Sequence, residues 1–239
     1  MAAMKLSVLI PVYNEEKTLD LILPKVLDLE KSSLVDELEV IAVDDCSKDN
    51  SLNLLKKYDS NKNIRLLVHE HNKGKGAAIK TAISEASGDY VVFQDADLEY
   101  DPQDLLKMLD FAVKNAADVL YGSRFQEKRK SPLGRVHYFA NAGLTTLSNI
   151  FTGLSLTDME TCYKMFRGEI LKKINIEEER FGLEPEITAK IAKICEKENL
   201  KMCEIPISYA PRKHDEGKKI GFKDGLRAVY IILKYGLFQ

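Results

Sequence analysis

Short apolar runs alternate with amphipathic segments through the first half of the chain, and this alternation limits the fold more than any other feature. The runs are rich in β-branched residues and almost continuously hydrophobic, which is typical of strands covered on both faces of a sheet. The expected strands are 5–13, 38–45, 64–70, 89–95 and 118–125. The expected helices are 16–29, 51–58, 75–86 and 102–115. The pattern predicts an α/β fold with a mostly parallel sheet and helices on both faces.

The alternation weakens after Phe125. From there we expect, in order, a basic loop (126–135), two helices (136–152 and 184–198), one strand (203–209), a second basic loop and a terminal helix (about 222–238). A chain of 239 residues, 45% of them hydrophobic, fits one large core. We therefore expect a single domain over residues 1–239, with a scaffold in the first half and a lid in the second.

The overall charge and the lengths of the apolar runs exclude several classes of protein. The formal net charge of −2 gives no reason to expect a nucleic-acid partner. No apolar run reaches the roughly 18 to 20 residues of a membrane-spanning helix, so we expect no such helix in this chain. The four cysteines form no CxxC pair and are expected to be reduced packing residues of a cytoplasmic protein.

Polar clusters follow the first four expected strands, at 13–15, 44–45, 69–75 and 95–99. In open α/β sheets a ligand binds in the crevice at the carboxyl ends of the strands. Any single cluster could be explained by turn formation or helix capping alone. Four of them at one sheet edge favour a ligand site.

Three carboxylates, Asp95, Asp97 and Glu99, stand within five residues of one another after a hydrophobic run. They repel one another by about 1 kcal/mol per pair unless a cation neutralises them. In an extended segment all three would point the same way. Hard oxygen ligands of this kind suit Mg²⁺ or Mn²⁺ shared with a diphosphate.

Eight motifs, in order along nearly the whole chain, resemble those of the GT-A glycosyltransferases of family 2, in particular the polyprenyl-phosphate (dolichyl-phosphate) mannose and glucose synthases. They are VLIPVYNEE (8–16), VDDCSKDNS (43–51), HNKGKGAAI (71–79), QDADLEYDP (94–102), GSRF (122–125), TDMETCYKMF (157–166), FGLEPEI (181–187) and EGKKIGFKDGLRA (216–228). The resemblance implies a Rossmann-like GT-A fold. It also implies an inverting, metal-dependent transfer of glucose or mannose from a UDP- or GDP-linked sugar to polyprenyl phosphate. Residues 1–125 would bind the nucleotide sugar, and residues 126–239 would bind the acceptor.

The resemblance also assigns roles to residues. Asp97 and Glu99 would hold Mg²⁺ or Mn²⁺, although relatives often carry Gln where Glu99 stands. Catalysis would involve Arg124 and Arg135, which would contact phosphate, and Asp158, which would orient the nucleophile or act as a weak base. Glu160 competes with Asp158 for that role. The nucleotide sugar would be bound by Pro11, Tyr13, Glu15, Asp44, Asp45, Lys75, Asp95, Ala96, Arg212 and Lys218.

Two basic segments, 126–135 and 212–239, suit an anionic membrane surface or a solvated loop and helix face. The terminal helix combines an apolar stripe with Lys223, Arg227 and Lys234, so it is expected either to lie at a membrane interface or to cover the sheet. We expect a location at the cytosolic face of a membrane, reached directly or through a membrane partner. Homo-oligomer formation is left open.

Two other functions remain open at the level of sequence. The chain could transfer sugar to a soluble saccharide acceptor, which would require a base positioned against a hydroxyl. It could also be a nucleotide-sugar binding subunit that has lost catalysis and works with a membrane partner. The intact acidic motif, Arg124 and Arg212 argue against such a loss.

Overall fold

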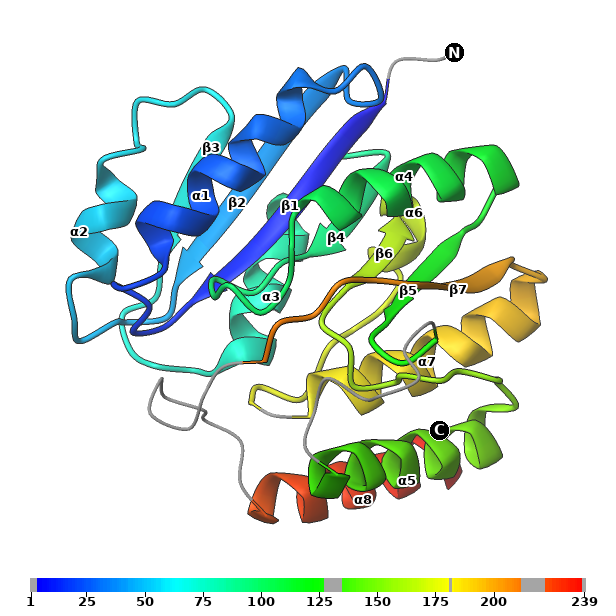
Figure 1. Cartoon of the computed structure of the whole chain (residues 1–239). Coiled ribbons are helices and arrows are strands. Elements are labelled where there is room, and N and C mark those ends of the chain that lie inside the picture. Colours follow the sequence, from blue (N-terminus) through cyan, green and yellow to red (C-terminus); the bar gives the residue numbers. More distant parts are fainter. Residues whose placement is uncertain (1–3, 127–134, 181, 212–221, 238–239) are drawn as a thin grey trace.

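The computed structural model describes residues 4–126, 135–180, 182–211 and 222–237 (Figure 1). Within these ranges one sheet is built from β1 (Lys5–Val12), β2 (Glu37–Asp44), β3 (Ile64–Val68), β4 (Tyr90–Phe93), β5 (Val119–Ser123), β6 (Lys164–Arg167) and β7 (Met202–Pro206). The helices are α1 (Leu19–Leu27), the 3₁₀ helix η1 (Asp28–Lys31), α2 (Ser51–Lys56), α3 (Lys75–Glu85), α4 (Gln103–Asn115), α5 (Arg135–Thr152), α6 (Gly168–Leu171), α7 (Leu183–Glu198) and α8 (Phe222–Leu237).

The strand order is β3-β2-β1-β4-β6-β5-β7, and helices flank the sheet (Figure 1). Strands β1 to β4 pair in parallel, as do β5 and β7, whereas β6 runs antiparallel to both β4 and β5. The predicted α/β fold with a mostly parallel sheet is confirmed. Strand β6 and helix α6 were not predicted, because each has only four residues and such a segment is too short to display a period.

Helix α4 illustrates how the sequence period produces the core. Its residues Leu105, Met108, Leu109 and Ala112 follow one another at helical spacing, and all four are buried. Burying a large apolar side chain stabilises the fold by about 1.5 to 3 kcal/mol. The helix ends at Ala116, whose φ of 49° places it in the left-handed region that terminates a helix.

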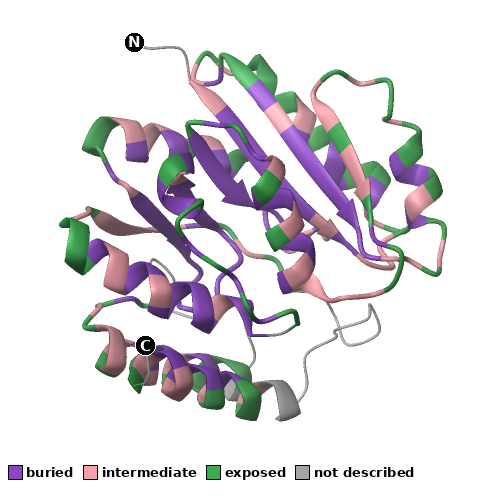
Figure 2. Cartoon of the chain, turned by 180° about the vertical axis from the view of Figure 1, so that it is seen from behind, coloured by how far each residue is buried: buried purple, intermediate pink, exposed green. Residues whose placement is uncertain are grey.

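Helix α8 has two apolar faces. One face, with Ala228, Ile231, Ile232 and Tyr235, is buried where α8 packs against α5 and α7. The other face carries three large exposed side chains, those of Leu226, Tyr230 and Leu237. Figure 2 shows exposed residues along both α5 and α8. Among the residues that the structure describes, no helix is long and apolar enough to cross a membrane.

The loop before α7 is packed against the first turn of α3. The amide N–H of Ala77 donates to the carbonyl of Glu179, at 3.1 Å. A Cβ on Gly76 would lie 1.9 Å from the carbonyl oxygen of Glu178, and one on Gly74 would lie 2.4 Å from that of Glu179. The two glycines therefore allow the 178–179 backbone to approach α3. The space beside them is filled by this backbone and is not open to a ligand.

We expect Gly76→Ala to destabilise the fold by about 1 to 3 kcal/mol, because the new methyl group must displace backbone rather than a side chain. Urea denaturation measures the free energy of unfolding. The matched control is Gly143→Ala in α5, where a Cβ meets nothing within 4 Å and alanine favours a helix by up to about 1 kcal/mol. Equal stability of Gly76→Ala and the parent chain would contradict this packing argument.

Candidate active site

The polar clusters after β1, β2, β3 and β4 lie at one edge of the sheet. The parallel register pairs Val12 with Asp44 and Asp44 with Val68, so these three strands end side by side. The N–H of Gln94 then donates to the carbonyl of Leu9 at 2.9 Å, which brings the end of β4 to the same edge. This edge is the candidate active site.

Asp45 organises the loop between β3 and α3. Its carboxylate accepts from the backbone N–H groups of Lys73 and Gly74, at 2.9 and 2.7 Å, and from the side-chain amide of Asn72, at 2.8 Å. The ring nitrogen Nδ1 of His69 lies 2.7 Å from the same carboxylate. All four groups belong to residues 69–74, so Asp45 fixes the shape of the loop that a ligand would contact.

Asp44 is buried, and one of its two carboxylate oxygens has no hydrogen-bond partner among the described residues. Its Oδ2 accepts from the N–H of Ser47 at 3.1 Å, whereas Oδ1 is buried and has no hydrogen-bond partner among the described residues. Leaving a buried acceptor unsatisfied costs about 1 to 3 kcal/mol. A donor group on a ligand would remove that cost.

Lys75 joins two acidic residues across the site. Its ammonium lies 2.9 Å from Oδ1 of Asp95 and 3.0 Å from Oε1 of Glu184 on α7. Burial would lower the pKa of Lys75, but neighbouring acidic groups, Asp95 foremost, hold that pKa well above its usual value. Lys75 therefore stays charged and partly neutralises the acidic turn, which comprises residues 95–99. The sequence does not single out Glu184 as a site residue, because no local pattern shows which glutamate faces Lys75.

The acidic turn itself is bent. Strand β4 ends at Phe93 and residues 96–100 form a bend, so the expectation of an extended segment is wrong. The N–H of Glu99 donates to Oδ1 of Asp97 at 2.9 Å, and the hydroxyl of Tyr209 donates to Oε2 of Glu99 at 3.0 Å. The hydroxyl of Thr18 donates to the carbonyl of Ala96 at 2.8 Å. Contacts within the turn and from Thr18 and Tyr209 thus fix its shape.

The carboxylates of this bend could bind a divalent metal ion only if a bound substrate supplied further metal ligands. The described part of the chain contains no group of three or more His, Cys, Asp or Glu side chains placed to hold a metal. Mg²⁺, however, usually takes one or two protein carboxylates and fills its shell with substrate phosphates and water. The oxygens of Asp97 and Glu99 match that donor set.

Arg124 and Asp158 form a buried pair. The guanidinium donates from Nε to Oδ2 and from Nη2 to Oδ1, each at 2.7 Å, and the N–H of Arg124 also donates to Oδ2, at 3.0 Å. Arg124 is 8% exposed and Asp158 0%. The structure thus brings together two residues that were predicted to be catalytic, and it does so as a bidentate ion pair.

The remaining predicted residues are placed less fully. Pro11 lies in β1, and Tyr13 and Glu15 follow that strand, all three half-buried. Arg135 is the first residue of α5, and its side chain lies outside what the structure describes. Arg212 and Lys218 also lie outside the described residues, so their roles stay predictions.

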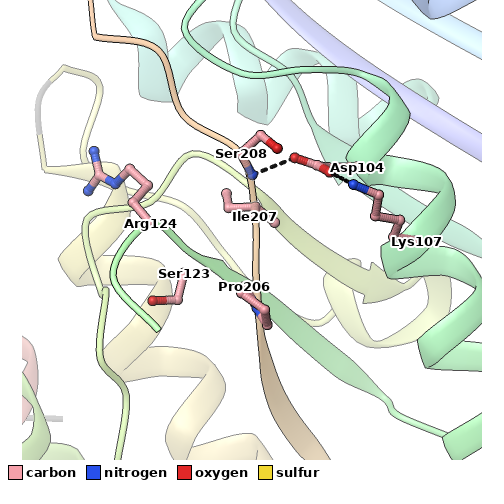
Figure 3. Close-up of a pocket in the computed structure, with 7 residues that line it drawn as sticks. All are labelled: Asp104, Lys107, Ser123, Arg124, Pro206, Ile207 and Ser208. Atoms are coloured by element: carbon pink, nitrogen blue, oxygen red, sulfur yellow. Dashed lines mark hydrogen bonds and ion pairs between the residues drawn. The ribbon is translucent and has the colours of Figure 1, made fainter. Parts of the chain in front are cut away.

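A cavity of about 210 Å³ lies beside Arg124 (Figure 3). Asp104 on one wall accepts from the N–H of Ser208 at 2.6 Å and from the ammonium of Lys107 at 2.5 Å. The lining residues are Asp104, Lys107, Ser123, Arg124, Pro206, Ile207 and Ser208. Pockets that enclose a small molecule measure roughly 300 to 1,000 Å³, so this cavity alone is too small for a nucleotide sugar.

The family model for glycosyl transferase family 2 matches residues 7–175, which include most of the sheet and the whole acidic turn. The chain belongs to glycosyl transferase family 2. The family resemblance noted in the sequence is confirmed.

Curated relatives of this family 2 chain act on polyprenyl phosphates, according to their names. A dolichol-phosphate mannosyltransferase of Pyrococcus furiosus is 27% identical over 237 residues, covering 97% of this chain and 64% of the relative. A dolichyl-phosphate beta-glucosyltransferase of Trichomonas vaginalis is 29% identical over 260 residues, covering 100% of this chain and 75% of the relative. The chain thus spans less than two thirds of the archaeal protein's length.

Among solved structures, glucosyl-3-phosphoglycerate synthase from Mycobacterium tuberculosis, in complex with Mn²⁺, UDP and phosphoglyceric acid, has a TM-score of 0.74 to this chain. The match covers 100% of this chain and 80% of that one, at 16% sequence identity. At this identity the likeness establishes the fold, and the GT-A architecture expected from the sequence is confirmed.

We expect Asp158→Asn to lower the free energy of unfolding by about 3 to 5 kcal/mol, because the change leaves the buried guanidinium of Arg124 without a counter-charge. Urea denaturation measures the loss. The control is Asp110→Asn, which breaks the exposed ion pair with Lys114 and should change stability by no more than about 0.5 kcal/mol. Similar small losses in both variants would mean that the Arg124–Asp158 pair is not structural.

Proposed function

We propose that this chain transfers a hexose from a nucleotide diphosphate sugar to polyprenyl phosphate. Membership of family 2 and the names of the relatives support this reaction. The observation that carries the proposal is the gathering of Asp44, Lys75, the acidic turn and the Arg124–Asp158 pair at one edge of the sheet. That edge offers acceptors for a base or ribose, charge for a diphosphate, and the guanidinium of Arg124 for a second phosphate.

The donor would occupy the side of the site next to β1, β2 and α3. The free Oδ1 of Asp44 can accept from a ring N–H or a ribose hydroxyl, and uracil and guanine both offer such an N–H. Tyr13 and Glu15 flank the same strand ends. Lys75 brings a fixed positive charge beside Asp95, near where the diphosphate would meet the acidic turn.

Asp97 and Glu99 are the residues that would hold Mg²⁺ or Mn²⁺. A divalent ion bound there would supply positive charge for the diphosphate leaving group. The hydroxyl of Tyr209 and the N–H of Glu99 fix the orientation of the two carboxylates before any ion arrives. That preorganisation lowers the cost of assembling the site.

The acceptor side needs cations, because two anions must approach each other. Arg124 is held by Asp158 at the end of β5, and Arg135 and Arg212 are the further residues that we propose for phosphate contacts. A phosphate nucleophile is already ionised at neutral pH, so no strong base is required. Direct attack on the anomeric carbon from the face opposite the leaving group would invert its configuration.

We further propose that α5 and α8 rest on a lipid surface. Six of the nine large hydrophobic side chains that are exposed in the described residues lie on these two helices, which pack side by side. The largest exposed fractions are 70% for Ile150, 69% for Phe139, 58% for Leu226 and Tyr230, and 56% for Leu237. An exposed apolar face of this kind suits the headgroup region of a bilayer.

Two of the three cations expected in the basic stripe of the terminal helix, Arg227 and Lys234, are paired within the protein, and the side chain of Lys223 lies outside what the structure describes. Nη2 of Arg227 lies 2.6 Å from Oε2 of Glu178, and the ammonium of Lys234 lies 3.1 Å from Oε1 of the same side chain. These two charges tie α8 to the loop before α7. The apolar residues are therefore the better target for testing membrane contact, since changing the charges would also release the helix.

The decisive experiment incubates the protein with UDP-glucose, GDP-mannose and related donors, Mg²⁺ or Mn²⁺, and a short polyprenyl phosphate. Mass spectrometry then identifies the product. A polyprenyl phosphate carrying one hexose supports the proposal. Transfer only to added saccharides would indicate a soluble acceptor, and nucleotide binding without sugar release would indicate a non-catalytic subunit.

We expect Asp97→Asn to lower turnover by at least about a hundredfold, or roughly 2.7 kcal/mol, because it removes a charged metal ligand. Initial rates are measured at saturating donor. The exposed Asp59→Asn serves as the charge-matched control and should keep parent activity. Full activity of Asp97→Asn, or of the parent protein in excess chelator, would exclude the metal assignment.

We expect the double change Leu226→Gln and Tyr230→Gln to reduce sedimentation with phosphatidylglycerol-containing vesicles at least about tenfold, because two apolar contacts with lipid are lost. Thermal stability should stay nearly constant, since both side chains are exposed. Leu21→Gln on α1, which removes an equally exposed leucine elsewhere, is the control. Equal binding by all three proteins would argue that this face does not meet the membrane.

A further inference from the structure

The segment that leads into β6 lies at the candidate active site because β6 is reversed. Met165 pairs with Val92 of β4, and Lys164 pairs with Tyr121 of β5, both in antiparallel register. The amino end of β6 therefore meets the carboxyl ends of its two neighbours. Residues 158–163 consequently reach the same edge as the acidic turn and Arg124, and they bring two carboxylates there.

The first of these carboxylates, Asp158, already accepts hydrogen bonds from the protein at both of its oxygens. Its Oδ2 accepts twice from Arg124, and its Oδ1 accepts from Nη2 of Arg124 at 2.7 Å and from the amide of Asn141 at 3.4 Å. The residue is 0% exposed. Asp158 thus acts through Arg124 as a positioning residue, with no free oxygen for a substrate.

The second carboxylate, Glu160, differs from Asp158 because one of its oxygens accepts no hydrogen bond from the described residues. The residue is partly exposed, yet its Oε1 is buried and lacks a hydrogen-bond partner within the described part of the chain. The buried ammonium of Lys164 donates to the carbonyls of Met159, at 2.9 Å, and Thr161. Lys164 therefore fixes the backbone on both sides of Glu160 while its carboxylate keeps an unused acceptor.

The charges around Glu160 determine what kind of ligand it can take. It interacts electrostatically with Glu184 from α7, Lys164 from β6, Arg124 after β5 and Asp158 from its own segment. Burial, aided by Glu184 and Asp158 and opposed by Lys164 and Arg124, raises the pKa of Glu160 to about 7. Negative neighbours disfavour a bound phosphate at this position. A neutral hydroxyl group is the better partner.

Residues proposed to bind the nucleotide sugar are linked to Glu160 through Glu184. Glu184, which acts electrostatically on Glu160, is bonded to Lys75, and Lys75 is bonded to Asp95 of the acidic turn. A sugar attached to a diphosphate at the turn would therefore lie within the group of residues that includes Glu160. The acceptor phosphate, in contrast, is better served by the guanidinium of Arg124.

We propose that the carboxylate of Glu160 accepts a hydrogen bond from a hydroxyl of the hexose being transferred and so helps to select the sugar. This inference rests on the proposed function. The sugar hydroxyl removes the cost of the unsatisfied oxygen. A site built to bond a hydroxyl rejects an analogue that lacks it, because the buried acceptor is then left unpaired.

The test compares nucleotide with nucleotide sugar by calorimetry in the presence of Mg²⁺. Glu160→Gln keeps the shape of the side chain but replaces one carboxylate oxygen with an amide. The variant should bind UDP and GDP within twofold of the parent protein. Its affinity for the preferred donor, UDP-glucose or GDP-mannose, should fall at least tenfold. Glu169→Gln, on α6 at the opposite end of β6, is the matched control and should change neither affinity.

The pH dependence gives a second readout that a merely structural role would not change. Because the ionised form accepts the hydrogen bond, donor affinity of the parent protein should rise as pH increases from 6 to 8, and this rise should be absent in Glu160→Gln. If that variant fails to fold, Glu160→Asp keeps the charge on a shorter side chain and should lose donor affinity while retaining the pH dependence.

Three outcomes are distinguishable. An equal loss of affinity for nucleotide and nucleotide sugar would overturn the inference, because it would mean that Glu160 only supports the fold. Unchanged donor binding in Glu160→Gln would overturn it as well. Failure of the parent protein to bind any nucleotide sugar would instead refute the proposed function on which the inference depends.

Discussion

The reversed strand β6 is the constraint on which the site depends. It lies between β4 and β5, so the chain reaches the active edge of the sheet three times at that place: after β4, after β5 and before β6 itself. The acidic turn, Arg124 and the 158–163 segment become neighbours for this reason. In a fully parallel sheet the start of such a strand would lie at the opposite edge, and Asp158 would have no access to Arg124.

The site tolerates its crowded acidic residues because three of them are paired with cations. Lys75 lies between Asp95 and Glu184, and Asp158 is paired with a guanidinium. Breaking either pair would leave a charge in a poorly solvated place, which costs several kcal/mol. Among the described residues, two buried carboxylate oxygens without a hydrogen-bond partner, one on Asp44 and one on Glu160, stand out against this pattern. Both are acceptors, which fits the binding of ring N–H groups and sugar hydroxyls that we propose.

The loop before α7 links the donor side of the molecule to α8. Its backbone lies against Gly76 at the start of α3, and Glu178 holds Arg227 and Lys234 of α8. Two of the charges that resembled a membrane-binding stripe, Arg227 and Lys234, thus hold α8 in place, and the outward apolar face is the surface that we propose for lipid contact. A helical pattern cannot distinguish these uses, because a cation on a helix can face a carboxylate as readily as it faces water.

The sequence by itself determined the α/β class, the parallel core and the strand ends where the site forms, because hydrophobic periodicity and turn residues are local signals. It identified Arg124, Asp158 and the acidic turn through their motifs. It did not reveal β6, which is too short to show a period, or the bend after β4. Only the tertiary structure decided that Asp158 is saturated by Arg124, that Lys75 joins Asp95 to Glu184, and that Glu160 keeps a free oxygen. Those facts depend on which side chains meet across the sheet edge, and residues far apart in sequence leave no local pattern to predict it.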